Sequence, residues 1–298
     1  MTDRPAYSFA PGPPPEASRY LANKDWLPAF SWQDVEPEEH ANAFTVAKAM
    51  QIDVLADIRE ELQRALDEGL PFEQFQANLR PRLEARGWWG KADMVDPGTG
   101  QMRRVQLGSP RRLRTIYRAN LRSARAAGQW EQIERTKRAL PYLEYRLGPS
   151  ERHRPHHQAK EGLILLADDP FWRQWYPPNG WGCNCWVRQL TRAQAEARGV
   201  GTAPEIPLTE VVNTRTGETR MVPVGLDPGW DRNPGQLRVG ASIDLLQAKA
   251  SAAPDAARVA LRDLEDGWMA ERARRQRGWR ADLPFLDALR RIFAGGAE

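Results

Sequence analysis

Cysteines and long apolar runs are scarce in this sequence. The longest apolar run, residues 163–167, is far shorter than the roughly 18 residues that a membrane-spanning helix needs. The only two cysteines, Cys183 and Cys185, are separated by one residue and are poorly placed to bridge each other, so no disulfide framework is expected. The first residues contain no basic stretch followed by an apolar one, as a secretory signal would. We therefore expect no contact with a membrane, and we expect the chain to act in a cytoplasm or in a particle assembled there.

Motifs of the common nucleotide-binding enzymes are also missing. The sequence has no Walker phosphate-binding loop and no glycine-rich dinucleotide fingerprint after a predicted strand. Its cysteines carry no local signature of a recognised cysteine nucleophile, and two neighbouring cysteines beside aromatic residues are more often structural. A Cys/His nucleophile is therefore kept only as a minor alternative.

The composition that remains is typical of a folded protein with many loops. Hydrophobic residues make up 41% and charged residues 28% of the 298 residues, which excludes wholesale disorder. Proline (24 residues) and glycine (23 residues) are frequent, so extended segments and loops are expected. At about 100–200 residues per domain, the length allows about two domains.

Charge is distributed unevenly along the chain. Between residues 34 and 68, ten acidic residues stand against three basic ones, a net charge of −7. Between residues 103 and 138, eleven basic residues stand against two acidic ones, a net charge of +9. This asymmetry predicts one surface for a polyanion or acidic partner and another for a basic partner.

Proline content and apolar spacing divide the chain into four stretches. Residues 1–36 hold six prolines and scattered aromatics with no helical or strand period, and we expect an arm that becomes ordered against a partner. Residues 37–138 have a helical pattern, residues 139–235 have strand patterns, and residues 236–298 return to helix. The predicted fold class is α+β: an N-terminal helical bundle, a small β-containing domain with a His/Cys cluster, and C-terminal helices.

Three helices are predicted in the helical stretch. Apolar residues recur at three- and four-residue steps: Leu55, Ile58, Leu62 and Leu66 in the first, Phe72, Phe75, Leu79 and Leu83 in the second, and Leu113, Ile116, Tyr117 and Leu121 in the third. Glycines at positions 69, 87 and 128 are predicted to end them. A polar loop is expected between the second and third helices, and Ser109 with Pro110 predicts the start of the third.

Strand patterns follow in residues 139–235. Leu143, Tyr145 and Leu147 alternate as in a strand, and residues 163–166 match a buried one. Residues 211–212 and 221–224 flank a turn-forming segment and predict a hairpin. The segment 171–186 carries six aromatic residues, and we expect these to form a core rather than an interface.

The third predicted helix carries a row of arginines. They follow three- and four-residue steps along one face: Arg111, Arg114, Arg118, Arg122 and Arg125. Guanidinium groups at this spacing can follow DNA phosphates, which give sequence-independent affinity through counterion release. The alternatives are a solvated face and a face that pairs with the acidic helix at residues 53–68.

Three of the four histidines lie in the segment 153–157, ahead of the two cysteines. An imidazole and two thiolates, from His157, Cys183 and Cys185, form a ligand set suited to zinc. A fourth ligand could come from one of four nearby side chains: His153, Glu161, Asp168 or Asp169. The alternative is buried structural cysteines with surface histidines, because structural zinc sites usually space their cysteines by two to four residues.

Several separate motifs in this order resemble the phage Mu protein F-like head-morphogenesis family. They are Ala43-Phe44-Thr45-Val46-Ala47-Lys48, Thr115-Ile116-Tyr117-Arg118-Ala119-Asn120 with Gly128-Gln129-Trp130, Arg154-Pro155-His156-His157, Asp168-Asp169-Pro170-Phe171-Trp172, Tyr176-Pro177-Pro178-Asn179-Gly180-Trp181, Cys183-Asn184-Cys185 and Gly229-Trp230-Asp231-Arg232-Asn233-Pro234-Gly235. The resemblance covers roughly residues 40–235. Two positions depart from it: Glu151 stands where Asp is expected, and Asn184 stands where Arg is common.

The resemblance implies a minor head (capsid) protein of a tailed double-stranded DNA phage or prophage. Such a protein acts near the portal in head morphogenesis, with portal and capsid or scaffold proteins as partners and with packaged DNA close by. Its place is the virion or procapsid, assembled in the cytoplasm of a bacterial host. The family members are not established enzymes, and their His and Cys positions carry over to His157, Cys183 and Cys185, where a structural zinc ion is the expected cofactor.

A second class of function stays open on the residues alone. A metal-dependent hydrolase, nuclease-like or toxin-like, would use the same His/Cys cluster with a carboxylate base from Asp168 or Asp169. It predicts a bound divalent ion with an open coordination position.

Overall fold

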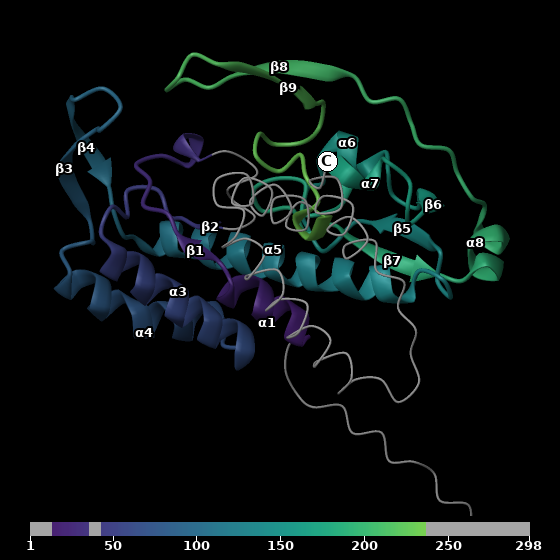
Figure 1. Cartoon of the computed structure of the whole chain (residues 1–298), viewed down its shortest axis with the longest axis horizontal. Coiled ribbons are helices and arrows are strands. Elements are labelled where there is room, and N and C mark those ends of the chain that lie inside the picture. The colour runs from purple at the N-terminus through teal and green to yellow at the C-terminus, as the bar shows by residue number, and fades with distance from the viewer. Residues whose placement is uncertain (1–13, 36–42, 237–298) are drawn as a thin grey trace, which may run out of the picture. The chain divides into compact units, whose positions relative to one another are not determined.

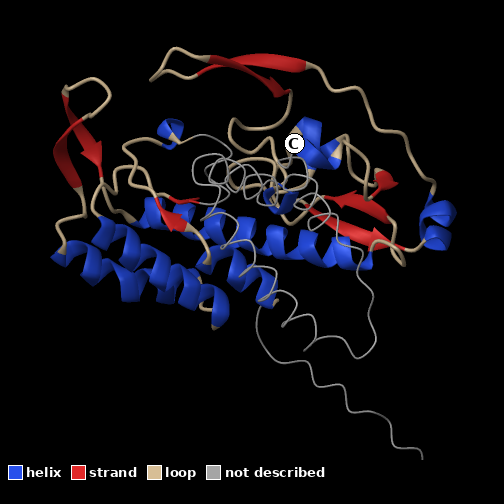
Figure 2. Ribbon diagram, in the orientation of Figure 1, coloured by secondary structure: helices blue, strands red, loops and turns tan. Residues whose placement is uncertain are grey.

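The structure is a computed structural model, and it describes residues 14–35 and 43–236 (Figures 1 and 2). Helices and small, mostly antiparallel sheets occur together, so the predicted α+β class is confirmed. Of the segment 236–298, for which C-terminal helices are predicted, all residues after 236 lie outside the described part. None of the helices in the described segments is long and apolar enough to span a membrane.

Four helices surround the first hydrophobic core: α1 (Pro15–Ala22), α3 (Ile52–Asp67), α4 (Phe72–Ala85) and the N-terminal part of α5 (Pro110–Thr136). Figure 1 shows α3 and α4 side by side below the long α5. Their buried residues are those that the apolar spacing selects, such as Leu55, Leu79 and Leu113, each with no exposed surface. The predicted small bundle is therefore confirmed.

Two of the predicted helix ends are confirmed. Gly69 and Gly87 have φ values of 69° and 70°, in the left-handed region that a glycine adopts without steric cost. After each glycine the backbone N–H turns back to the helix: Leu70 N–H donates to the Ala65 carbonyl (3.0 Å) and Trp88 N–H to the Leu83 carbonyl (2.8 Å). These bonds satisfy carbonyl groups that the helix end leaves without a partner.

The third predicted helix end is wrong. α5 passes through Gly128 and ends at Thr136. Gly128 is buried, and a Cβ placed on it would lie 2.7 Å from the backbone nitrogen of Ala17. The glycine thus lets α1 approach α5 closely instead of ending the helix. As predicted, Ser109 caps the start of α5, with its side chain accepting a hydrogen bond from the Arg112 N–H (3.3 Å).

The expectation of an arm without helix or strand is wrong for residues 14–35. This segment forms α1, the short strand β1 (Asp25–Trp26) and the 3-10 helix η1 (Trp32–Asp34). β1 pairs in parallel with β2 (Ala43–Phe44). Ala17, Tyr20 and Phe30 are buried in the first core, so the segment packs on its own chain. The N-terminal residues 1–13 lie outside the described part.

The polar loop expected before α5 is a β-hairpin instead. β3 (Lys91–Val95) and β4 (Met102–Gln106) pair antiparallel. Of their ten residues only Val105 is buried, so the hairpin extends from the helices with little apolar surface to bury (Figure 1).

A second core forms around a three-stranded antiparallel sheet. Its order is β6 (Ile164–Leu166), β5 (Tyr142–Arg146) and β7 (Trp186–Leu190), which confirms the strands predicted around residues 143–147 and 163–166. α5 contributes Trp130 and Ile133 to this core. The short helices α6 (Pro155–Gln158) and α7 (Trp172–Trp175) lie near one end of the sheet, and α8 (Arg192–Arg198) follows β7 (Figure 2).

The aromatic segment 171–186 behaves in two ways. Four of its aromatics lie in the second core, as expected: Phe171, Trp172, Trp175 and Tyr176. Trp181 and Trp186 are instead 43% and 45% exposed. The core prediction therefore holds for the first part of the segment and fails for these two tryptophans.

The predicted hairpin after residue 208 is confirmed. β8 (Leu208–Val212) and β9 (Thr219–Pro223) pair antiparallel. The turn that joins them carries Arg215, whose guanidinium bonds both oxygens of the buried Asp96 (2.7 and 2.9 Å) and also pairs with Asp34. This contact ties the β8–β9 turn to the β3–β4 hairpin and to η1.

Candidate functional site

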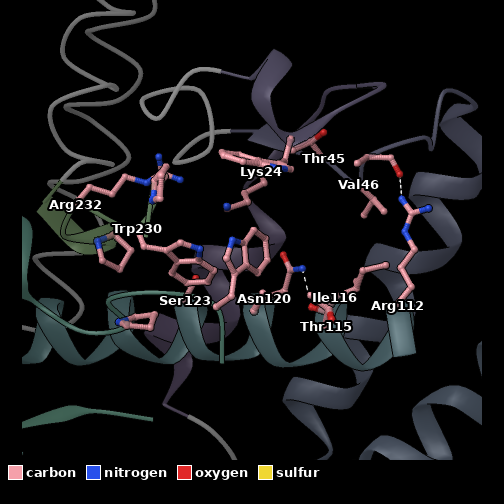
Figure 3. A pocket seen from close by; sticks show the side chains of 18 of the residues that line it. Lys24, Thr45, Val46, Arg112, Thr115, Ile116, Asn120, Ser123, Trp230 and Arg232 are labelled. Carbon is pink, nitrogen blue, oxygen red and sulfur yellow. Dashed lines mark hydrogen bonds between the residues drawn. The ribbon is translucent and has the colours of Figure 1, made fainter. Parts of the chain in front are cut away.

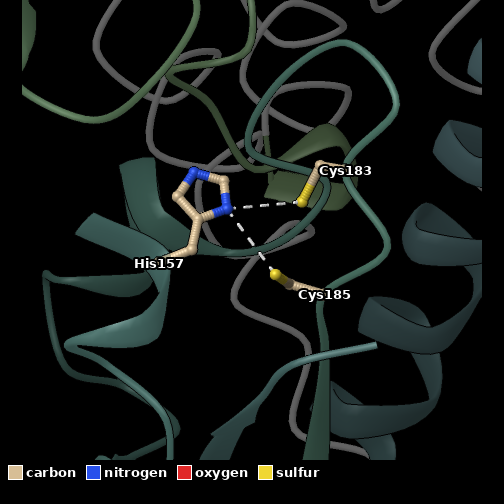
Figure 4. A group of neighbouring side chains, drawn as sticks. All are labelled: His157, Cys183 and Cys185. Atoms are coloured by element: carbon tan, nitrogen blue, oxygen red, sulfur yellow. Dashed lines mark hydrogen bonds between the residues drawn. The ribbon is translucent and has the colours of Figure 1, made fainter. Parts of the chain in front are cut away.

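The predicted zinc ligands come together in the structure. His157 stands on α6, and Cys183 and Cys185 lie in the loop that leads into β7 (Figure 4). The Nδ1 atom of His157 is 3.8 Å from Sγ of Cys183 and 3.6 Å from Sγ of Cys185. All three side chains are buried, at 3%, 6% and 8% exposure. The alternative of buried cysteines with surface histidines is therefore wrong about His157, which is buried.

The imidazole of His157 is held in one tautomer. Its Nε2 lies 2.9 Å from the carbonyl oxygen of Gly225, and because a carbonyl can only accept, Nε2 carries the proton. In the neutral ring, Nδ1 then offers its lone pair, and this atom faces both sulfur atoms (Figure 4). A hydrogen bond from the second ring nitrogen to a carbonyl is the usual support of a metal-ligating histidine.

The distances fit a tetrahedral zinc ion. With Zn–N of about 2.05 Å and Zn–S of about 2.3 Å, a nitrogen and a sulfur ligand lie about 3.6 Å apart. The observed 3.6 and 3.8 Å agree with this value, and the three ligand atoms all lie within 4.8 Å of one another. The residues present therefore fit the ion, with three ligands supplied by the described part of the chain.

The pKa values of the two thiols are shifted in opposite directions. A hydrogen bond from Cys185 lowers the pKa of Cys183 against the effect of burial. The sulfur of Cys183 and burial in turn raise the pKa of Cys185. One sulfur of the pair is thus held as a thiolate, which is the form that binds metal.

The four side chains considered as a fourth ligand are engaged elsewhere. His153 bonds the carbonyl of Gly148, and Glu161 pairs with Arg146. Asp168 pairs with Lys137, and Asp169 accepts from the N–H of Phe171. Within the described residues, no carboxylate joins the group of His157 and the two cysteines.

The arginine row of α5 lies near the same loop. Arg111, Arg114, Arg118 and Arg125 are exposed. Arg122 is half-buried and donates to the carbonyl oxygen of Cys183 (2.6 Å), so it joins the helix to the cysteine loop. Arg114 packs its guanidinium over the ring of Phe72, 4.7 Å from the ring centre.

The arginine row does not pair with the acidic helix, as one alternative proposed. Among the residues that the structure describes, none of its five members forms an ion pair with a carboxylate. The carboxylates of α3 bind other arginines: Asp57 and Glu60 bind Arg82, while Asp53 and Asp57 bind Arg86. The other alternative, a face that is merely solvated, agrees with the exposure of the row. It does not explain why so much positive charge is concentrated there.

Two neighbouring cavities border α5. We call the first, of about 260 Å³, the aromatic cavity; the described residues that line it include Tyr20, Lys24, Trp32, Arg112, Thr115, Asn120, Ser123, Trp181, Trp230 and Arg232 (Figure 3). We call the second, of about 240 Å³, the arginine cavity; it is lined by Arg111, Arg114, Thr115, Arg118, Ala119, Arg122, Pro178, Gly180, Trp181, Gly182 and Trp230. Sequence reasoning missed Lys24 and Trp230 as site residues, because no local pattern connects them to α5.

Comparison with known proteins confirms the resemblance. A model of the family described as "Phage Mu protein F like protein" matches residues 56–188. The chain is 39% identical over 254 residues to the "Putative capsid assembly protein F" of Escherichia phage Mu, covering 79% of this chain and 57% of that protein. It is 35% identical over 234 residues to the "Mu-like prophage FluMu F protein" of Haemophilus influenzae, covering 73% and 55%.

The Mu F-like segment contains all of α5, the His/Cys cluster and the second-core aromatics. Trp230 and Arg232 of the aromatic cavity lie beyond it. The chain spans a little over half the length of the two relatives. No solved structure matches the chain.

Proposed function

We propose that this chain is a minor head protein of a tailed double-stranded DNA phage or prophage. In this role it acts in head morphogenesis near the portal, within a procapsid or virion assembled in the bacterial cytoplasm. The match of residues 56–188 to the Mu F-like family and the similarity of the chain to a protein named for capsid assembly support the role. Portal and capsid or scaffold proteins are the proposed protein partners.

The unpaired arginine row of α5 carries the second part of the proposal, contact with DNA. Charged side chains that stabilise a fold usually face an opposite charge, as Arg82 does on α4 and Arg86 does just after it. The five arginines of the row lack such a partner among the described residues, and all of them except the half-buried Arg122 are exposed. Four of them line one cavity, so their fields add in one place.

The length of the row suits a phosphate chain. From Arg111 to Arg125 an α-helix rises about 21 Å. Phosphates along one DNA strand follow at about 3.4 Å of helix axis, so the row spans about six phosphate steps and its five guanidinium groups can contact some of these phosphates. Contacts to phosphates give affinity without reading sequence, and a protein that meets DNA of any sequence in a head needs this kind of contact.

The His/Cys cluster has a structural place in this proposal. Zinc bound by His157, Cys183 and Cys185 would cross-link α6 to the start of β7 and so stabilise the second core. The cluster is buried in that core and lines neither the aromatic nor the arginine cavity. A closed position of this kind suits a structural ion.

The hydrolase alternative receives less support. A catalytic ion needs an open coordination position and a nearby carboxylate base. Asp168 is bound to Lys137 on the surface, and Asp169 bonds the backbone at the start of α7. Neither belongs to the group around His157 within the described residues.

A salt titration of binding tests the DNA contact. The full chain should bind duplex DNA of unrelated sequences with similar affinity, and the logarithm of the binding constant should fall with the logarithm of salt concentration by about 0.9 per phosphate contacted. Replacing Arg114 and Arg118 by Gln should reduce the slope by about two. Arg192→Gln is the matched control, because Arg192 is exposed on α8 and lines neither cavity. Equal slopes in all three proteins would refute the proposal.

Elemental analysis tests the zinc site. The wild-type chain should carry one zinc per molecule, and Cys183→Ser and His157→Ala should lose it together with a fall in melting temperature. His156→Ala is the control: its side chain is exposed on the same helix and stays outside the cluster. A metal-free wild type would leave the two cysteines as ordinary core residues.

Head assembly itself is tested in the phage. Heads formed without this chain should be fewer or should fail to retain DNA, and the chain should co-purify with portal assemblies. Normal yields of filled heads without this chain would contradict the head role. The DNA and zinc proposals would then depend only on their own experiments.

A further inference from the structure

The aromatic cavity and the arginine cavity are adjacent along α5. Five residues line both of them: Thr115, Ala119, Pro178, Trp181 and Trp230. Neighbouring parts of one extended ligand can therefore occupy the two cavities.

The two cavities have charge of one sign. Among the described residues that line them there are six arginines and one lysine, and none is Asp or Glu: Arg111, Arg114, Arg118 and Arg122 in the arginine cavity, Lys24, Arg112 and Arg232 in the aromatic one. Such a pair of sites attracts an anion and repels a cation.

Arg112 shows that this charge lies partly inside the protein. Its guanidinium stacks over Trp88, 4.8 Å from the ring centre, and donates to the carbonyls of Ala47, Gln106 and Leu107. Burial lowers its pKa to about 10, and within the described residues it has no carboxylate partner. A negatively charged ligand in the aromatic cavity would supply the missing opposite charge.

Aromatic surface distinguishes the first cavity from the second. Trp32 is 39% and Trp181 43% exposed, which is unusual for side chains of this size. Trp181 stands edge-on to Trp230, with ring centres 5.1 Å apart. Exposed tryptophans beside cations are the arrangement on which nucleic acid bases stack.

The opposite wall can meet the polar edge of a base. Figure 3 shows α5 along one side of the cavity, with Thr115, Asn120 and Ser123 directed toward it and Lys24 and Thr45 on the other side. The Asn120 amide donates to the Ile116 carbonyl (2.9 Å), and its Oδ1 has no donor among the described residues. The volume of about 260 Å³ is below that of a site for a drug-sized ligand, which suits one base rather than a base pair.

We propose that the aromatic cavity receives one base of a single-stranded stretch of DNA whose phosphates lie on the arginines of the arginine cavity. A base inside a duplex is covered on both faces by its neighbours, so only an unpaired or extruded base can enter. The inference rests on the proposed DNA contact of α5 and adds to it a preference for strand ends or unpaired segments.

The test separates base binding from phosphate binding. The full chain is titrated with a fluorescent oligothymidine and with an abasic strand of the same length, which keeps the phosphates and lacks the bases. Stacking predicts that the oligothymidine binds roughly fivefold or more tightly than the abasic strand. Trp181→Leu should abolish this difference, whereas Trp186→Leu should keep it, because Trp186 is equally exposed and lines neither cavity.

Each other outcome counts against the inference. Equal, salt-dependent binding of both strands would overturn the base site and leave the phosphate contact intact, while no binding of these strands or of duplex would remove both proposals. Equally tight binding of a blunt duplex and of oligothymidine would also overturn the assignment. The same holds if free thymidine monophosphate displaces the oligothymidine at an equal concentration of nucleotide.

A second variant is available if Trp181→Leu does not fold. Asn120→Asp places a carboxylate in the cavity and should reduce oligothymidine binding by at least tenfold.

Discussion

Arg82 near the end of α4 and Arg86 just after it lie against the carboxylates of α3, whereas the arginine row of α5 meets no carboxylate of the described residues. Both helices pack on the same hydrophobic core through their apolar faces. The two surfaces therefore differ in what their charge meets, although their sequences contain the same basic residue at helical spacing.

The difference separates charges that hold the fold from charges that are available to a ligand. Asp57 is 4% exposed and binds both Arg82 and Arg86, so α3 and α4 depend on it for their mutual orientation. Arg118 is exposed and lines a cavity. The charge of Arg82 and Arg86 is used for packing, and the charge of the arginine row is available to a partner.

Removal of the shared carboxylate should produce the largest effect. Asp57→Ala leaves two arginines without their buried partner, and we expect a loss of about 2–3 kcal/mol, below the value for a fully buried pair because both arginines are about one-third exposed. Thermal and urea unfolding measure it. Glu60→Ala is the control, since Glu60 is 69% exposed and should cost less than about 1 kcal/mol. Equal losses for the two variants would contradict the division into packing and available charge.

Acid should weaken the paired charges in a defined pH window. The hydrogen bonds from Arg215 hold the pKa of Asp96 at about 2, and although burial alone would raise the pKa of Asp57, Arg86 and Arg82 hold it below its ordinary value. Because these folded-state values lie below the unfolded value of about 3.9, the stabilisation is fully present above pH 4 and is lost as the pH falls toward 2. Melting temperatures between pH 6 and pH 2.5 should show the decline.

The Asp96→Asn variant tests the origin of that decline. It should melt lower than wild type at pH 6 and show a flatter dependence on pH below 4. A dependence identical to that of wild type would mean that other carboxylates control the acid response.

Changes in the arginine row should have the smallest effect on stability. Arg118→Gln removes an exposed charge without a carboxylate partner, so unfolding free energy should change by no more than about 0.5 kcal/mol. Arg86→Gln, at a paired position, should cost more. A large destabilisation by Arg118→Gln would show that the row serves the fold, and the comparison between the helices would fail.

The helices that apolar spacing predicts are those with a continuous buried face. Three- and four-residue steps such as Leu55, Ile58 and Leu62 report such a face directly, whereas α1 has only eight residues and follows a proline-rich run. The β3–β4 hairpin buries only Val105 fully, and its apolar alternation is limited to Ala92 and Met94, which is too short to predict a strand. The role of Gly128 could not be told from the sequence. A glycine that ends a helix and a glycine that lets a neighbouring helix approach give the same sequence pattern.

The candidate site divides in a similar way. His157, Cys183 and Cys185 could be predicted, because few residue types bind zinc and the chain contains few of them. The aromatic cavity could not be predicted, because Lys24, Asn120 and Trp230 come from distant parts of the sequence and only the fold brings them together. The arginine spacing indicated a face, but the missing carboxylate partners became visible only in three dimensions.

α5 has a mechanical consequence that follows from its length. Its 27 residues form a rod of about 40 Å, and its buried side chains are embedded in the first core near one end and in the second core near the other. A strand pulled along the arginine face would load this rod in shear along its axis, and both cores would share the force. The helix could then be displaced only if its packing in both cores were disrupted. A DNA strand under tension would therefore be held by both cores together rather than by a single surface loop.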